Sequence, residues 1–171
     1  MRGVSRLGLF AYALAAGVVA LDQLSKHWIL AVFQLPLKGG VAIAGPLHLT
    51  MVWNRGVSFG LLRAEVDVTR WALAAFSVAV ALLLAVWARR ATCGLAALAL
   101  GLIMGGAIGN VIDRARFGAV VDFIDVSRLW FPWIFNLADA AISCGVALLL
   151  LDMLLQERQD KAAKAGAGDA I

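Results

Sequence analysis

Carboxylates that stand inside apolar segments are the first candidates for chemistry in this chain. Asp139 lies in FNLADAAI (135–142), where the last long apolar run begins. An acid within a membrane span costs about 2.5 to 3.5 kcal/mol near the bilayer centre, so it is a functional candidate by default. A structural interpretation is equally open, because Asn136 at a helix N-cap would place Asp139 at the third helical position, as in a capping box.

Four other aspartates lie in or beside apolar segments and are candidate partners: Asp22, Asp113, Asp122 and Asp125. Two of them have basic neighbours, since Lys26 follows Asp22 by one helical turn and Arg114 adjoins Asp113. Ion pairing is therefore the expected role of Asp22 and Asp113.

The strip VVDFID (120–125) holds the other two acids. Asp122 has no basic residue beside it, and an unpaired carboxylate in apolar surroundings is costly unless it is shared. Asp125 could face the same way if the strip is helical. The pattern by itself does not separate Asp122 from Asp125.

Other catalytic arrangements fit less well. The two histidines, His27 and His48, form no HExxH motif, so we expect no zinc site of the metalloprotease kind and no metal. A Ser/Lys dyad of Ser25 or Ser58 with Lys26 is conceivable, but Ser25 and Lys26 are neighbours on a helix and point apart. The chain has no GxSxG motif and no phosphate-cradling loop.

The composition is that of an integral membrane protein. Of 171 residues, 63% are hydrophobic and only 15% are charged, and the mean hydropathy is +0.88. The net charge of +4 does not indicate nucleic-acid binding, because no basic stripe interleaved with aromatic residues accompanies it. Cys93 and Cys144 lie in apolar runs without CxxC or His partners, which favours small buried side chains over metal or redox chemistry.

Four apolar segments are long enough to cross a bilayer as helices, at 7–26, 69–88, 91–112 and 134–155. We expect a single membrane domain over 1–155 and a solvated, disordered cytoplasmic tail over 156–171. A cleavable signal peptide is the alternative for the first segment, although polar residues continue it and the rest of the chain is itself multispanning.

An even number of spans puts both termini on one side of the membrane. Basic residues close to the span ends, such as Arg6 and the Arg89–Arg90 pair, favour a cytoplasmic location for the termini. The two longer connections, over 26–70 and 113–133, then share the opposite face, where the polar residues concentrate. We therefore expect a site near the extracytoplasmic face.

Two further patterns describe how this site is supported. The connection over 41–60 has short β-branched and aromatic runs broken by Gly-Pro and Asn-Arg-Gly, which predicts a small extramembrane sheet or hairpin. Gly101, Gly105 and Gly109 recur every four residues, which predicts a helix face in close contact with a neighbouring helix.

Five motifs in this order resemble the lipoprotein signal peptidase (signal peptidase II) family, the membrane aspartic peptidases of bacteria. They are DQLSK (22–26), NRGVSFG (54–60), GNVIDR (109–114), VVDFID (120–125) and FNLADAAI (135–142). Ser58 stands where many members have alanine, and no motif covers the chain after about residue 155.

The resemblance implies a membrane all-α bundle of four transmembrane helices in the bacterial inner membrane. A small extracytoplasmic sheet would follow the first helix, and a short extracytoplasmic segment would join the third and fourth. It also implies hydrolysis of diacylglyceryl-modified prolipoproteins just before the lipid-bearing cysteine. Membrane lipids and the cyclic peptide inhibitor globomycin are further implied partners, and no cofactor is implied.

The resemblance further implies that Asp122 and Asp139 are the catalytic pair. The positions that match its supporting residues are Asp22, Lys26, Asn54, Gly56, Asn110, Asp113, Arg114, Asn136 and Ala138. We expect three of these residues to orient the pair or to stabilise the oxyanion: Asn110, Asn136 and Arg114. Asn54, in the extramembrane connection, is expected to meet the substrate backbone.

Two alternatives from other classes remain at this point. A small proton-coupled transporter could use Asp139 and Asp22 as a relay, although the chain shows no internal repeat. A scaffold subunit without chemistry would have no use for acids and amides gathered on one face.

Overall fold

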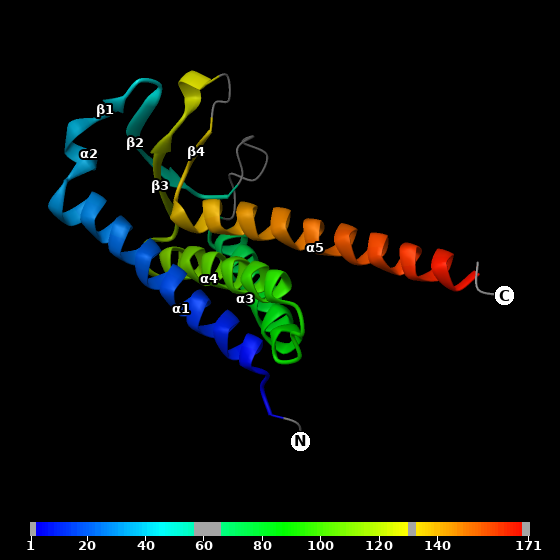
Figure 1. Ribbon diagram of the computed structural model, residues 1–171. Coiled ribbons are helices and arrows are strands. Elements are labelled where there is room, and N and C mark those ends of the chain that lie inside the picture. The colour runs from blue at the N-terminus through cyan, green and yellow to red at the C-terminus, as the bar shows by residue number, and fades with distance from the viewer. Residues whose placement is uncertain (1–2, 57–65, 130–132, 169–171) are drawn as a thin grey trace.

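Four long helices dominate the computed structural model, which describes residues 3–56, 66–129 and 133–168 (Figure 1). They are α1 (Arg6–His27), α3 (Val66–Ala88), α4 (Gly94–Phe117) and α5 (Leu137–Gly168). All four are long and apolar enough to cross a membrane, as the sequence predicted. Ser58, considered above for a Ser/Lys dyad, lies outside the described residues.

The first three helices differ from the predicted spans at their ends. α1 runs on into a π-helical segment, Trp28–Val32, and a short helix, α2 (Leu35–Lys38), follows. α3 begins at Val66. α4 is shifted toward the C-terminus and ends where Gly118, at a φ of 75°, donates its N–H to Arg114. Hydropathy locates an apolar window, whereas caps and local hydrogen bonds set the helix ends.

α5 starts later and ends later than the span predicted at 134–155. Ile134–Phe135 form a short strand, β4, and the helix then continues to Gly168. The structure thus differs from the disordered tail predicted after residue 155. Ala, Lys, Glu and Gln, which are strong helix formers, are frequent there, and Lys161 pairs with Glu157 one turn earlier at 2.6 Å.

α4 lies between the other three helices and is the most buried of the four. Its predicted glycine face packs against α1, where a Cβ on Gly101 would stand 2.8 Å from the carbonyl oxygen of Ala11. A Cβ on Gly105 would stand 2.6 Å from the Cβ of Val18. Only glycine permits this backbone approach, so the prediction of close helix contact is confirmed.

A four-stranded antiparallel sheet stands at one end of the bundle, away from both termini (Figure 1). The predicted hairpin forms from β1 (Val41–Ala44) and β2 (Leu47–Asn54). The connection between α4 and α5 adds β3 (Val120–Asp125) and β4, in the order β1-β2-β3-β4. The strip that holds Asp122 is therefore a strand.

The opposite end of the bundle contains a buried acid that the sequence analysis missed. Asp152 is 5% exposed and accepts hydrogen bonds from Cys93 Sγ at 3.0 Å and Gln156 Nε2 at 2.6 Å. Its signal was present, since Asp152 interrupts an apolar run as Asp139 does. The interpretation of both cysteines as buried was wrong, because Cys144 faces outward from α5 and is exposed.

Candidate active site

β3 separates the two acids that the sequence left equivalent. Side chains three residues apart on a strand point to opposite faces. Asp122 points inward and is 1% exposed. Asp125 accepts hydrogen bonds from the Thr50 hydroxyl at 2.7 Å and the Ser127 N–H at 2.9 Å. The Ser127 side chain, followed by these two donors, lowers the pKa of Asp125.

Asp139 enters from the first turn of α5, and Asn136 is the N-cap of that helix. The side-chain oxygen of Asn136 accepts the Asp139 N–H at 2.9 Å, and Asp139 Oδ2 accepts the Asn136 N–H at 3.3 Å. This reciprocal pair is a capping box, as one of the two sequence interpretations predicted. It also holds the Asp139 carboxylate at the positive end of the helix dipole.

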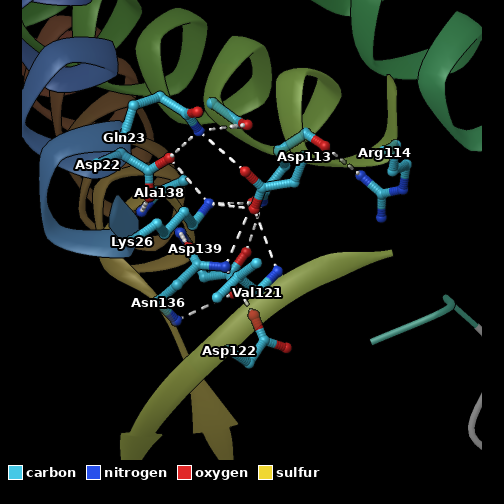
Figure 2. A network of polar contacts seen from close by, with 12 residues as sticks. Asp22, Gln23, Lys26, Asp113, Arg114, Val121, Asp122, Asn136, Ala138 and Asp139 are labelled. Carbon is cyan, nitrogen blue, oxygen red and sulfur yellow. Dashed lines mark hydrogen bonds and ion pairs between the residues drawn. The ribbon is translucent and has the colours of Figure 1, made fainter. Parts of the chain in front are cut away.

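The cap residue connects the two acids. Asn136 Nδ2 donates to Asp122 Oδ1 at 2.6 Å while its oxygen holds the Asp139 backbone (Figure 2). Asn136 is fully buried. One side chain thus fixes the spacing between the strand and the helix that carry Asp122 and Asp139, which we call the site acids.

Two more asparagines donate to the site acids. Asn110 Nδ2 donates to Asp139 Oδ1 at 2.7 Å, and Asn54 Nδ2 donates to Asp122 Oδ2 at 2.9 Å. The Asn54 amide lies against Asp122 because β2 pairs with β3 at this point. Its contact with the substrate backbone stays a prediction.

Each of these amides is oriented by a second partner. The Asn54 oxygen accepts the Gly56 N–H at 2.9 Å, and the Asn110 oxygen accepts Lys26 Nζ at 3.4 Å and Asn136 Nδ2 at 3.3 Å. With the oxygens committed to donors, the NH₂ groups point at the carboxylates.

The environment of Asp122 favours its protonated form. Burial is the main cause that raises its pKa to about 6, and the negative charge of Asp139 acts in the same direction. The hydrogen bonds from Asn54 and Asn136 oppose the shift.

A cation stands near the pair. Arg114 lies one turn after Asn110 on α4, is partly buried, and donates to the Asn110 backbone oxygen at 3.4 Å. Its charge interacts with Asp139 and Asp122 as well as with Asp113.

A buried ion cluster lies next to the site acids (Figure 2). Lys26 Nζ lies 2.8 Å from Asp22 Oδ2 and 2.6 Å from Asp113 Oδ2, and all three side chains are at most 2% exposed. The pairing predicted for Asp22 is confirmed. Asp113 pairs with Lys26 across two helices, whereas the sequence suggested its neighbour Arg114.

Each carboxylate of this cluster also accepts a hydrogen bond from a backbone N–H group. Asp22 Oδ1 accepts the N–H of Ala138 at 3.0 Å, next to the site acid of α5. Asp113 Oδ2 accepts the N–H of Val121 at 3.1 Å, next to the site acid of β3. Lys26 therefore ties together α1, α4, α5 and β3 at the point where the site acids meet.

One glutamine, Gln23, and one glycine, Gly56, complete the surroundings of the site acids. Gln23, which the sequence analysis did not single out although it lies in the DQLSK motif, donates to Asp113 at 2.9 Å and to Asp22 at 3.1 Å. Gly56 has a φ of 95°, and a Cβ there would collide with the Leu73 side chain on α3.

The chain matches a known family over most of its length. The sequence model described as signal peptidase (SPase) II matches residues 14–155. The chain belongs to the signal peptidase II family. It is 57% identical to a lipoprotein signal peptidase of Caulobacter vibrioides over 155 residues, which cover 90% of this chain and 92% of that protein. A lipoprotein signal peptidase of Methylorubrum extorquens is 47% identical, over 87% of this chain and 86% of that protein.

Solved structures show the same fold. A chain described as a bacterial membrane enzyme superimposes with a TM-score of 0.74 at 26% identity, covering 92% of this chain and 94% of that one. Signal peptidase II enzymes are aspartic peptidases, so this protein is an aspartic endopeptidase. Its four apolar helices fit a protein of the bacterial inner membrane.

The alternatives from the sequence fit this signal peptidase II structure poorly. The Ser25 hydroxyl donates to the Asp22 backbone oxygen at 2.7 Å, while the Lys26 ammonium is held in its ion pairs, so these two side chains form no dyad. Asp22, the second group of the transporter relay, is committed to the same cluster. Among the described residues, no three His, Cys, Asp or Glu side chains gather where they could hold a metal ion.

Proposed function

We propose that this signal peptidase II cleaves diacylglyceryl-modified prolipoproteins just before the lipid-bearing cysteine, with Asp122 and Asp139 as its catalytic pair. The observation that carries the proposal is the double role of Asn136, which hydrogen-bonds both acids from the start of α5. Peptide hydrolysis by two carboxyl groups needs one protonated acid and one ionised base, and the raised pKa of Asp122 favours Asp122 as the acid.

The two acids divide the proton transfers. Asp139, in its ionised form, takes a proton from water as the water oxygen bonds to the scissile carbonyl carbon. Asp122, whose pKa is raised, holds a proton and hydrogen-bonds the carbonyl oxygen as it becomes an alkoxide. When the C–N bond breaks, the proton held by Asp139 passes to the leaving amine. The products are a new carboxyl end and the free amino group of the lipidated cysteine.

The supporting residues keep this geometry. Asn110 and Asn54 each orient one acid, and Arg114 stabilises the negative charge that develops on the carbonyl oxygen. The buried ion cluster acts through the backbone beside the catalytic pair, so its members are positioning residues: Asp22, Lys26 and Asp113.

We place the site near the extracytoplasmic face, with both termini in the cytoplasm. The sheet and the start of α5, which carry the site acids, lie at the end of the bundle remote from both termini (Figure 1). A signal helix with acyl chains at its end can then approach laterally through the bilayer while water reaches the site from the polar face. We expect globomycin to inhibit the enzyme in competition with lipidated precursor.

Three substitutions of one kind test the catalytic pair. We expect Asp122→Asn and Asp139→Asn each to lower cleavage of a lipidated precursor by at least about 10³-fold while the protein still inserts and folds. Asp125→Asn is the matched control, because Asp125 lies on the same strand and faces Thr50. It should retain activity. Full turnover by either site variant, or equal cleavage of the unlipidated precursor by the parent protein, would contradict the proposal.

A further inference from the structure

An apolar cavity of about 580 Å³ lies within the spans, between α1, α3 and α4. On α1 it is lined by Tyr12, Ala16 and Val19, and on α4 by Met104 and Ile108. None of the residues that line it belongs to the candidate active site. Water does not fill a cavity of this kind inside hydrocarbon, so an acyl chain is its natural occupant.

A second cavity, of about 210 Å³, stands at the ends of α1 and α4 and has a different chemistry. Gln23 and His27 line it from α1, and Arg116 and Phe117 from α4. Arg116 is exposed, donates to Gln23 Oε1 at 3.4 Å, and stacks on the Phe117 ring at 5.0 Å. Within the described part of the chain, no carboxylate forms an ion pair with Arg116.

The two cavities follow one face of α1. From Tyr12 through Ala16, Val19 and Gln23 to His27, the lining residues of α1 recur every three or four positions, which is one helical face. At about 1.5 Å per residue this face is about 22 Å long. Half of a bilayer with its head groups measures about 20 to 22 Å. The combined length of the apolar part and the polar end therefore matches the thickness of one leaflet.

We infer that this face binds one glycerophospholipid of the surrounding bilayer, with an anionic head group. An acyl chain lies in the apolar cavity, and the phosphate lies at Arg116 and His27. The neighbouring Lys26 is neutralised by its own two acids, so Arg116 supplies the charge that selects the phosphate. The lipid fills the space between α1 and α3, which touch each other far less than either touches α4. The apolar cavity shares no lining residue with the candidate active site, whereas the polar cavity adjoins the buried ion cluster at Lys26 and Gln23.

Native mass spectrometry of the full-length protein, extracted from nanodiscs of phosphatidylglycerol and phosphatidylcholine, tests this inference. We expect one retained phosphatidylglycerol. Arg116→Gln should weaken its retention about fivefold. Arg90→Gln, which removes an exposed arginine at the other end of the bundle, should not. The readout is lipid mass, so it does not depend on the catalytic pair.

A second pair of variants tests the apolar part. Ala16→Phe places a ring in the cavity and should weaken retention about tenfold or more, because burial of several methylenes is lost. Ala13→Phe is the matched control, since Ala13 is exposed on α1 and does not line the cavity. Equal retention by both variants, equal retention of the two lipids, or displacement by a lipidated precursor would overturn the inference.

Discussion

Asn136 and Asp122 are joined by a 2.6 Å hydrogen bond from Nδ2 to Oδ1, and the same asparagine begins the helix that carries Asp139. The bond connects strand β3 of the sheet to the start of the apolar helix α5. The position of the sheet is thus coupled to the geometry of the two site acids, the proposed catalytic pair. A change at the cap is therefore expected to affect both stability and rate.

Asn136→Ala removes the helix cap and the contact to Asp122 together. We expect a loss of about 1 kcal/mol in the free energy of unfolding, as for other N-caps, and a fall of about 10²- to 10³-fold in kcat. The control is Ser5→Ala, because Ser5 caps α1 through the Gly8 N–H at the far end of the bundle. It should cost similar stability and leave kcat unchanged. Equal effects of the two variants on kcat would refute the coupling.

Lys26→Met leaves Asp22 and Asp113 buried without their cation. We expect a loss of about 3 to 5 kcal/mol, the usual cost of breaking a buried pair from one side. Lys161→Met removes a pair of the same spacing whose two side chains are 74% and 60% exposed. That change should stay within about 0.5 kcal/mol. Unfolding in mixed micelles with increasing SDS measures both, and a mild effect of Lys26→Met would show that the cluster is not essential to the fold.

The pH profile should follow Asp122. If Asp122 supplies the proton, kcat/KM falls about tenfold per pH unit above its pKa of about 6. The folded-state pKa lies above the ordinary value of 3.8, so protonation stabilises the folded protein. This stabilisation is complete below the ordinary pKa of 3.8 and is lost as the pH rises from there through about 6.

Asp122→Asn is the control for the pH experiment, since it removes the titrating group and should flatten the dependence of unfolding stability in this window. Cleavage of a lipidated precursor and SDS unfolding at matched pH values provide the two measurements. A level kcat/KM on the alkaline side would rule out Asp122 as the proton donor.

Gly105→Ala tests the close contact between α1 and α4. The added Cβ would stand 2.6 Å from the Val18 side chain, so the helices must separate, and we expect a loss of about 1 to 3 kcal/mol. Gly17→Ala on α1 meets nothing within 4 Å and should be neutral or stabilising by up to about 1 kcal/mol. Thermal denaturation in detergent compares the two, and a stable Gly105→Ala protein would mean that this approach is not needed.

Hydropathy and spacing determined much of this protein, because membrane spans and helix faces are local properties of the chain. Periodicity or composition within one segment predicted the four apolar segments, the glycine face of α4 and the Asp22–Lys26 pair. Turn residues between two short runs predicted the β1–β2 hairpin. The capping box at Asn136 is local too, since its partner stands three residues away.

The tertiary structure alone decided how these elements combine. Asp122 differs from Asp125 only because the strip pairs with β2 as a strand, and Asn54 meets Asp122 through that pairing. Lys26 reaches Asp113 because the glycines of α4 let α1 approach. Such contacts join residues far apart in sequence, and their energies depend on burial that no local pattern encodes.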